Sequence, residues 1–310
     1  MEVNELNKKA KGGTELMMQR IHNTLDPELL NKFQIIPSRV RELDPNKKTI
    51  LYVHDLAGDP EVQHLKDGGW KKFDKIVFVS HWQQQMYNLV LGVPYSAGVV
   101  LRNAIEPLPY HGKPNDGTIR LIYTSTPHRG LNILYSVFNV LAQKYDNIEL
   151  DVYSSFKLYG WEERDAPYKE LFDLLKKHPN VHYHGSVSND EIRKALIKAD
   201  IFAYPSIWQE TSCLCLIEAM SAGLICVHSS LAALPETSMS LTSMYGFTED
   251  MHTHANTFAS RLAGIIELMQ DSSKRDIVDA NLHTTKQIVD PTYSWNNRAT
   301  EWSNMLTSLL

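Results

Sequence analysis

Short apolar runs alternate along the chain with stretches in which apolar residues recur every three or four positions. The apolar runs lie at 33–37, 49–54, 75–80, 98–101, 118–124, 148–153 and 181–184. The helix-like stretches include 60–72, 81–91, 131–144, 167–177, 189–199, 258–269 and 272–289. Strands that alternate with helices are typical of parallel sheets covered by helices, so the pattern predicts an α/β protein.

A proline- and glycine-rich stretch, PLPYHGKPNDG at 107–117, interrupts this alternation and is typical of a linker. The 310 residues suffice for two domains of ordinary size. We therefore predict a first domain over 1–106 and a second over 118–292, with a last helix over 293–310.

Two carboxylates, Glu210 and Glu218, lie eight positions apart in the segment 205–227. An apolar run ends just before this segment, and Thr211 and Ser212 offer hydroxyl caps, so we expect a helix to begin directly after Glu210. Glu218 then lies about two turns into this helix, which Gly223 ends. A helix N-terminus favours a diphosphate, and carboxylates accept hydrogen bonds from vicinal hydroxyls. The combination indicates a nucleotide sugar, whereas an arbitrary acid pair is more often a solvated helix face.

The segment resembles the E-x7-E motif of retaining GT-B glycosyltransferases of family four, through Pro205-Ser206, Glu210, Glu218-Ala219-Met220 and Gly223. The resemblance implies two Rossmann-like domains that face each other across a cleft. It also implies a truncated first domain, because no apolar strand precedes the Gly12-Gly13 turn. The implied reaction moves a sugar, with retention and without a metal or other cofactor, from a UDP- or GDP-sugar to a hydroxyl of a saccharide, lipid or other acceptor.

The same resemblance implies roles for individual residues. Glu210 holds the hydroxyls of the transferred sugar and Glu218 those of the ribose, while Arg129 and the amides near Thr211, Ser212 and Cys213 face the diphosphate. Val187 lies by the base, and the stretch 228–236 is a loop that closes on the donor. His54 lies near the anomeric carbon, or is simply hydrogen-bonded at a strand end. Gly12 and Gly13 let backbone amides approach a phosphate or sugar, or are plain turn residues.

Composition and charge restrict the classes of partner that the protein can bind. The net charge is −5 and the basic residues are dispersed, which argues against a nucleic-acid partner. No apolar run is long enough to cross a bilayer, and we expect a cytoplasmic protein. Peripheral membrane association and homo-oligomerisation both stay open.

Two groups of side chains invite a metal or disulfide assignment that we do not favour. We interpret Cys213, Cys215 and Cys226 as buried, reduced thiols, and Cys213 and Cys215, as helical neighbours two positions apart, cannot face each other. His178, His182 and His184 read as separate surface and strand residues.

Two other functions remain as alternatives. One is a nucleotide-sugar epimerase or phosphorylase on the same fold, which would turn over without an added acceptor or would depend on phosphate. The other is a non-catalytic, glycosyltransferase-like binding subunit.

Overall fold

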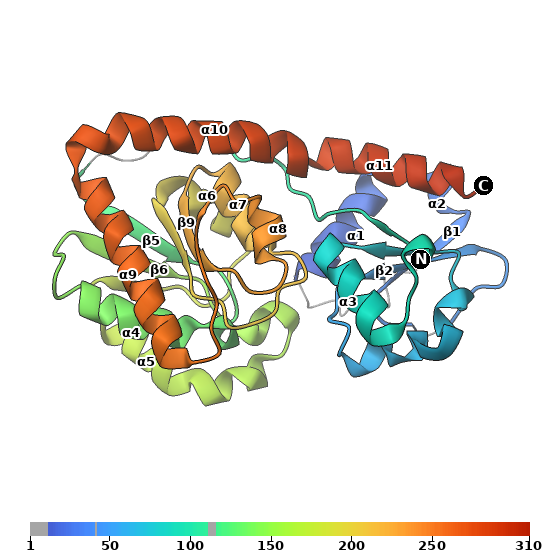
Figure 1. The fold of residues 1–310 in the computed structure, drawn as a ribbon, viewed down its shortest axis with the longest axis horizontal. Helices are drawn as coiled ribbons and strands as arrows, with labels where there is room; N and C mark the ends of the chain where they lie inside the picture. The colour runs from blue at the N-terminus through green and yellow to red at the C-terminus, as the bar shows by residue number, and fades with distance from the viewer. Residues whose placement is uncertain (1–11, 41, 111–115) are drawn as a thin grey trace.

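Two parallel α/β domains lie side by side in the computed structural model, which describes residues 12–40, 42–110 and 116–310 (Figure 1). The N-terminal domain holds a four-stranded sheet and the C-terminal domain a six-stranded one. All neighbouring strands are parallel. The predicted α/β fold of two Rossmann-like domains is confirmed.

The N-terminal sheet has the order β1-β2-β3-β4, with strands β1 (Phe33–Pro37), β2 (Lys48–Val53), β3 (Lys75–Phe78) and β4 (Gly98–Val100). Its side chains alternate between two cores. Ile50 and Tyr52 pack in a cluster with residues of α1 (Gly13–Thr24), and Leu51 and Val53 in one with residues of α3 (His81–Leu91). Burial on both faces explains why the strands are mostly apolar. A short helix, α2 (Pro27–Leu30), precedes β1.

The C-terminal sheet has the order β10-β9-β8-β5-β6-β7. Its strands are β5 (Ile119–Tyr123), β6 (Ile148–Val152), β7 (Val181–Tyr183), β8 (Ile201–Tyr204), β9 (Ile225–Ser229) and β10 (Ser243–Tyr245). The chain first builds outward from β5 to β7 and then returns to pair β8 with the other side of β5. In open α/β sheets a ligand binds at such a reversal, beyond the strand C-termini.

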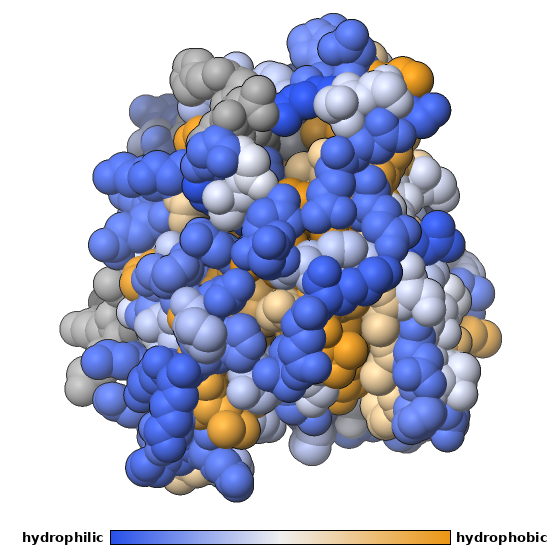
Figure 2. All heavy atoms as spheres, turned by 90° about the vertical axis from the view of Figure 1, so that its left-hand side faces the viewer, coloured by the Kyte–Doolittle hydropathy of each residue, from blue (hydrophilic) through white to orange (hydrophobic). Residues whose placement is uncertain are grey.

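The helices of the C-terminal domain cover both faces of its sheet (Figure 1). They are α4 (Leu131–Leu141), α5 (Lys169–Lys177), α6 (Asn189–Lys198), α7 (Leu214–Ser221), α8 (Leu234–Ser238) and α9 (Met251–Gln270). Seen from the end of this domain that lies at the left of Figure 1, the surface is mostly hydrophilic with scattered apolar patches (Figure 2). The helices thus turn their polar faces to solvent.

Two consecutive helices, α10 (Arg275–Tyr293) and α11 (Trp295–Ser308), run as one rod along both domains (Figure 1). Ser294 separates them with ψ 140°, outside the helical range. Trp295 and Trp302 are buried in the N-terminal core, and the Trp302 ring lies 5.0 Å from that of Tyr52. The last helix of the chain therefore completes the core of the first domain.

Several expected elements differ from the structure. The stretch Pro60–Lys72 is not one α-helix, because Lys66, Asp67 and Gly68 have non-helical angles between short 3-10 segments. The expected loop 228–236 instead contains the end of β9 and the start of α8. The other 3-10 segments are Tyr95–Ala97, Pro127–Arg129, Phe156–Tyr159, Glu162–Tyr168 and Ser272–Lys274.

The predicted linker begins as packed structure, because Leu108 is buried and its N–H donates to Ser221. Residues 111–115 of this linker and 1–11 of the predicted first domain lie outside the described residues. Within the part of the chain that is described, no helix has both the length and the apolar character needed to cross a membrane.

Candidate functional site

Two loops meet at the crevice between β5 and β8. One follows β5 and contains Arg129, and the other follows β8 and contains Glu210. Gly130 allows them to touch, since it has φ +113° and a Cβ there would lie 2.2 Å from the carbonyl oxygen of Pro205. A side chain at this position would push the loops apart. Glycine is therefore required where the two loops join.

A cleft of about 230 Å³ opens over this crevice, between the two domains. The individual residues that the sequence assigned to the donor site line it, namely Gly12, Gly13, His54, Arg129, Val187, Glu210, Thr211, Ser212, Cys213 and Glu218, whereas the stretch 228–236 does not. Sequence reasoning missed other lining residues, including Thr126, Tyr153, Ser155, Tyr159 and Asn189. Both domains thus contribute to one site.

Glu210 is 5% exposed and forms an ion pair with Arg129, whose Nη1 lies 2.7 Å from its Oε1. The Tyr204 hydroxyl also donates to this oxygen and lies 3.5 Å from the Ser125 hydroxyl. Burial lowers the pKa of Arg129, but Glu210, together with Tyr159, Tyr204 and Cys213, raises it by more, so the pKa of Arg129 lies above its usual value. Burial, and then Glu210, raise the pKa of Tyr204, which stays a hydrogen-bond donor. Glu210 is therefore held in place from two sides.

Glu218 is 3% exposed and contacts two residues of α6. Arg193 Nη1 lies 3.3 Å from Glu218 Oε1, and Asn189 Nδ2 donates to the same oxygen at 3.3 Å. Ser188 caps α6, and Asn189 is the first residue of this helix. Burial raises the pKa of Glu218, and Arg193, Asn189 and, from the N-terminal domain, Arg20 act against that rise. The two acids therefore face one cleft with separate sets of partners.

Helix α7 begins later than predicted. Its N-cap is Cys213, and neither Thr211 nor Ser212 caps it. Thr211 instead donates its hydroxyl to the carbonyl of His54 at 2.9 Å, which links the two domains. Glu218 is consequently the fifth residue of the helix, a little over one turn from its start. The N-termini of α7 and α1 both lie at the cleft, so unpaired N–H groups of two helices are available to an anion.

His54 follows β2 and packs edge-on against Tyr52, with ring centroids 4.3 Å apart. Its Nε2 is buried without a hydrogen-bond partner among the described residues. Burial lowers the pKa of His54 to about 3, so the ring is neutral at physiological pH. A neutral imidazole at a cleft wall can accept or donate one hydrogen bond to a bound ligand.

Other polar atoms of the cleft wall are also buried without partners in the described part of the chain: Thr124 Oγ1, Thr126 Oγ1 and Arg129 Nε. Buried polar groups in folded proteins are normally hydrogen-bonded. Hydroxyl and guanidinium groups can all donate, which suits an anionic, oxygen-rich ligand. The sequence signal was the hydroxyl-rich run Thr124-Ser125-Thr126 at the end of the apolar run 118–124.

The expectation that Cys213 and Cys215 cannot face each other is wrong. Cys213 precedes the helix with ψ 96°, and the two thiols are hydrogen-bonded. The prediction assumed that both residues were helical. All three cysteines are free thiols, and Cys213 and Cys226 are buried.

The three histidines of 178–184 each have a different neighbour. His178 accepts a hydrogen bond from the Asn180 N–H, while His182 and His184 lie 3.7 and 2.6 Å from different carboxylates, Glu149 and Asp151. No three His, Cys, Asp or Glu side chains are placed to hold a metal ion in the described residues.

The chain is similar in sequence to known glycosyltransferases. Residues 119–268 match the family model described as "Glycosyl transferases group 1". A curated relative, lipopolysaccharide 1,2-N-acetylglucosaminetransferase of Salmonella typhimurium, is 25% identical over 285 residues, which cover 86% of this chain and 69% of the relative.

Solved structures share the fold. A glycosyltransferase from Rickettsia africae superposes with a TM-score of 0.69 at 14% identity and covers 98% of this chain and 84% of its own. HepE of Anabaena, solved with UDP and glucose, has a TM-score of 0.62 at 16% identity and covers 84% of this chain and 72% of its own. Over most of its C-terminal domain, the chain is thus similar in sequence to the family described as "Glycosyl transferases group 1".

Proposed function

We propose that this protein is a retaining glycosyltransferase that moves a sugar from a nucleotide diphosphate sugar to a hydroxyl acceptor. The observation that carries the proposal is the composition of the cleft wall. Two buried acids, Glu210 and Glu218, lie beside buried donors that have no partner among the described residues, and beside the N-termini of α1 and α7. A ligand with both diol and diphosphate groups would satisfy all three features at once.

The contacts suggest how each group acts. Arg129 and the α7 amides stabilise the charge that develops on the leaving diphosphate. The diphosphate competes with Glu210 for Arg129, and Glu210, still held by Tyr204, then accepts hydrogen bonds from the transferred sugar. Glu218 accepts from the ribose hydroxyls, and Val187 lies near the base. His54 lines the cleft wall from the N-terminal domain, where it contacts the reacting sugar.

We propose that the donor is a UDP- or GDP-sugar. HepE, which shares the fold, was solved with UDP and glucose, which supports the uridine nucleotide. The acceptor is a saccharide or a lipid-linked saccharide, since the Salmonella relative is named for lipopolysaccharide. The acceptor would bind on the N-terminal side of the cleft. Closure of the two domains on both substrates would then exclude water from the reaction.

The proposed transfer needs no divalent metal, because Arg129 and the two helix N-termini supply the positive charge that a metal would otherwise provide. The test is the rate of transfer after treatment with EDTA and after readdition of magnesium or manganese. An unchanged rate supports the proposal, and a rate that vanishes and returns with the metal contradicts it.

The central experiment compares the wild type with Glu210→Gln. Nucleotide sugars are first screened by thermal stabilisation, since a bound donor raises the melting temperature. Transfer and hydrolysis of the stabilising donor are then measured. We expect Glu210→Gln to lower transfer by about 100-fold, as for other residues that stabilise a transition state. Full activity in the variant would refute the assignment. Donor turnover without an acceptor, or dependence on phosphate, would favour an epimerase or phosphorylase, and binding without turnover would favour a binding subunit.

A further inference from the structure

Cys213 and Cys215 lie at the start of α7, between Glu210 and Glu218, and both line the cleft. The proposed transfer assigns no role to either thiol group. Cys213 is 3% exposed, and Cys215 is half-buried. The Cys215 thiol donates a hydrogen bond to the carbonyl of Thr124 at 2.9 Å and is hydrogen-bonded to Cys213. The two sulfur atoms are therefore neighbours in a chain of hydrogen bonds.

The backbone brings the two residues within disulfide range. The intervening Leu214 is helical, and in a helix the Cα atoms of residues two apart are about 5.4 Å apart. Disulfides usually join Cα atoms about 4.4–6.8 Å apart. In a regular helix these side chains would diverge, but Cys213 has ψ 96° and lies outside the helix. The side chain of Cys213 is instead hydrogen-bonded to that of Cys215.

The environment also distinguishes the two sulfur atoms. The hydrogen bond from Cys213 lowers the pKa of Cys215, against the effect of burial. The same hydrogen bond, with burial, raises the pKa of Cys213. A thiolate is the reactive form of cysteine, so Cys215 is the nucleophile and Cys213 the resolving thiol.

We propose that Cys213 and Cys215 form a redox-modification site in which a peroxide joins the two thiols in a reversible disulfide. In the first step the Cys215 thiolate attacks hydrogen peroxide, forming an S–O bond and breaking the O–O bond with release of hydroxide. Cys213 then attacks the sulfenic sulfur, forming the S–S bond and breaking the S–O bond, so that the second oxygen also leaves as hydroxide. With the two thiol protons, one peroxide yields two water molecules. The ring that this bond closes is small, and strained disulfides are readily reduced again.

The bond would change the cleft directly. It removes the hydrogen bond from Cys215 to Thr124 and fixes the first turn of α7, whose amides face the cleft. We expect oxidation to weaken nucleoside diphosphate binding by about tenfold, a consequence that rests on the proposed function. The disulfide itself does not depend on that function.

The test uses the full chain, reduced and desalted, then exposed to hydrogen peroxide, blocked with N-ethylmaleimide and cut at glutamates. Cleavage after Glu210, Glu218 and Glu236 places Cys213 and Cys215 in the peptide 211–218 and Cys226 in 219–236. We expect peptide 211–218 to be unalkylated and about 2 Da lighter than the same peptide with two free thiols. After reduction with dithiothreitol and renewed treatment with N-ethylmaleimide, it should carry two alkyl groups. Peptide 219–236 should be alkylated throughout.

Cysteine variants supply the controls. Cys226→Ser should form the light peptide as the wild type does, whereas Cys213→Ser and Cys215→Ser should not. The decisive measurement is made on the wild type, so a variant that fails to fold does not affect it. The proposal is overturned if peptide 211–218 keeps two alkyl groups after peroxide, is oxidised only to sulfinic or sulfonic acid, or is linked to Cys226. Nucleoside diphosphate binding, measured on the same samples, separates the two ideas. If the disulfide-containing peptide forms in a protein that binds no nucleotide, the result supports the redox site and contradicts the proposed function.

Discussion

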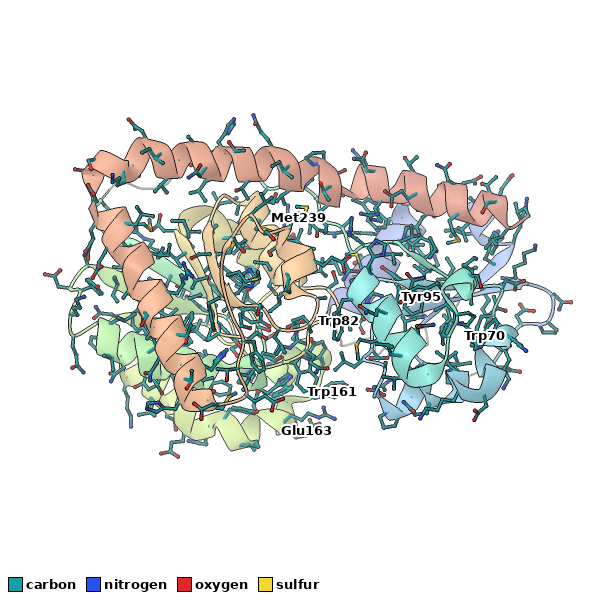
Figure 3. The ribbon with its side chains drawn as sticks, viewed as in Figure 1. Trp70, Trp82, Tyr95, Trp161, Glu163 and Met239 are labelled. Carbon is teal, nitrogen blue, oxygen red and sulfur yellow. The ribbon has the colours of Figure 1, made fainter. Side chains whose placement is uncertain are left out.

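The carboxylate of Glu236, in the C-terminal domain, accepts a hydrogen bond of 2.9 Å from the backbone N–H of Trp82, in the N-terminal domain. It also accepts from the N–H of His81 at 3.0 Å and lies 3.4 Å from Arg102. These amides begin α3, where unpaired N–H groups favour a negative charge. Trp82 lies on the side of its domain that faces the other, away from Trp70 (Figure 3). Glu236 thus joins the two domains.

Glu236→Ala should loosen this contact between the domains. Loss of a helix cap costs about 1 kcal/mol, so the amides of His81 and Trp82 should exchange with solvent roughly five times faster. Hydrogen exchange followed by mass spectrometry measures this, and kinetics should show a lower turnover because closure is less complete. Glu267→Ala, which removes a surface ion pair with Lys144, is the matched control. Unchanged exchange at both amides in Glu236→Ala would show that the contact does not hold the domains.

Arg129→Lys should weaken nucleoside diphosphate binding by about tenfold and leave nucleoside binding unchanged. Lysine keeps the charge beside Glu210 but loses the fork that binds two oxygens together. Alanine is unsuitable, since a buried carboxylate left without its cation destabilises the fold by about 3–5 kcal/mol. Calorimetry with both ligands is the measurement, and Arg120→Lys, at a more exposed ion pair, is the control. Equal losses for the two ligands would exclude a phosphate role.

Tyr204→Phe should reduce transfer by about tenfold, because Glu210 loses a hydrogen-bond donor that fixes its carboxylate. Tyr293→Phe removes a buried hydroxyl that donates to the carbonyl of Thr237. Both variants should lose about 1 kcal/mol of stability, and only Tyr204→Phe should lose activity. Parallel urea unfolding and transfer assays compare them. If activity falls equally in both, Tyr204 has only a structural role.

His54 should make the fold less stable at acid pH. Its pKa is about 3 in the fold and about 6.5 in the unfolded chain, so the unfolded state takes up a proton first as pH falls. The contribution of neutral His54 to the free energy of unfolding is fully present above about pH 6.5 and declines as the pH falls toward 3. Between pH 7.5 and 5.0 the wild type should lose about 2 kcal/mol more than His54→Gln. Urea unfolding at both pH values tests this, and equal losses would mean that His54 titrates normally.

Trp302→Ala should destabilise the protein by about 3–5 kcal/mol, as for other buried aromatic residues replaced by alanine. Trp302 is a residue of α11 whose fully buried side chain packs in the N-terminal core. Trp208 is 43% exposed and makes a suitable control. Trp208→Ala should cost much less. Thermal unfolding compares the two variants. A small loss for Trp302→Ala would mean that α11 contributes little to the first domain.

The elements that could be predicted are those with a strong local pattern. Continuous apolar runs marked the buried parallel strands, and Gly223 marked the end of α7. The start of α7 was misplaced because Thr211 and Ser212 have the right chemistry for a cap. Thr211 instead uses its hydroxyl on His54, more than 150 positions away in the chain. A distant partner of this kind leaves no local signal.

The amino-acid sequence by itself determined the alternation of strands and helices, the proline-rich boundary and the acid pair, because each depends on neighbouring residues. Only the tertiary structure decided which side chains meet. It joined Arg129 to Glu210 and Arg193 to Glu218, brought Glu236 to the start of α3, and turned Cys213 toward Cys215. The physical reason is that contacts across a cleft depend on the order of the strands and the orientation of the domains. Local sequence periodicity determines neither of them.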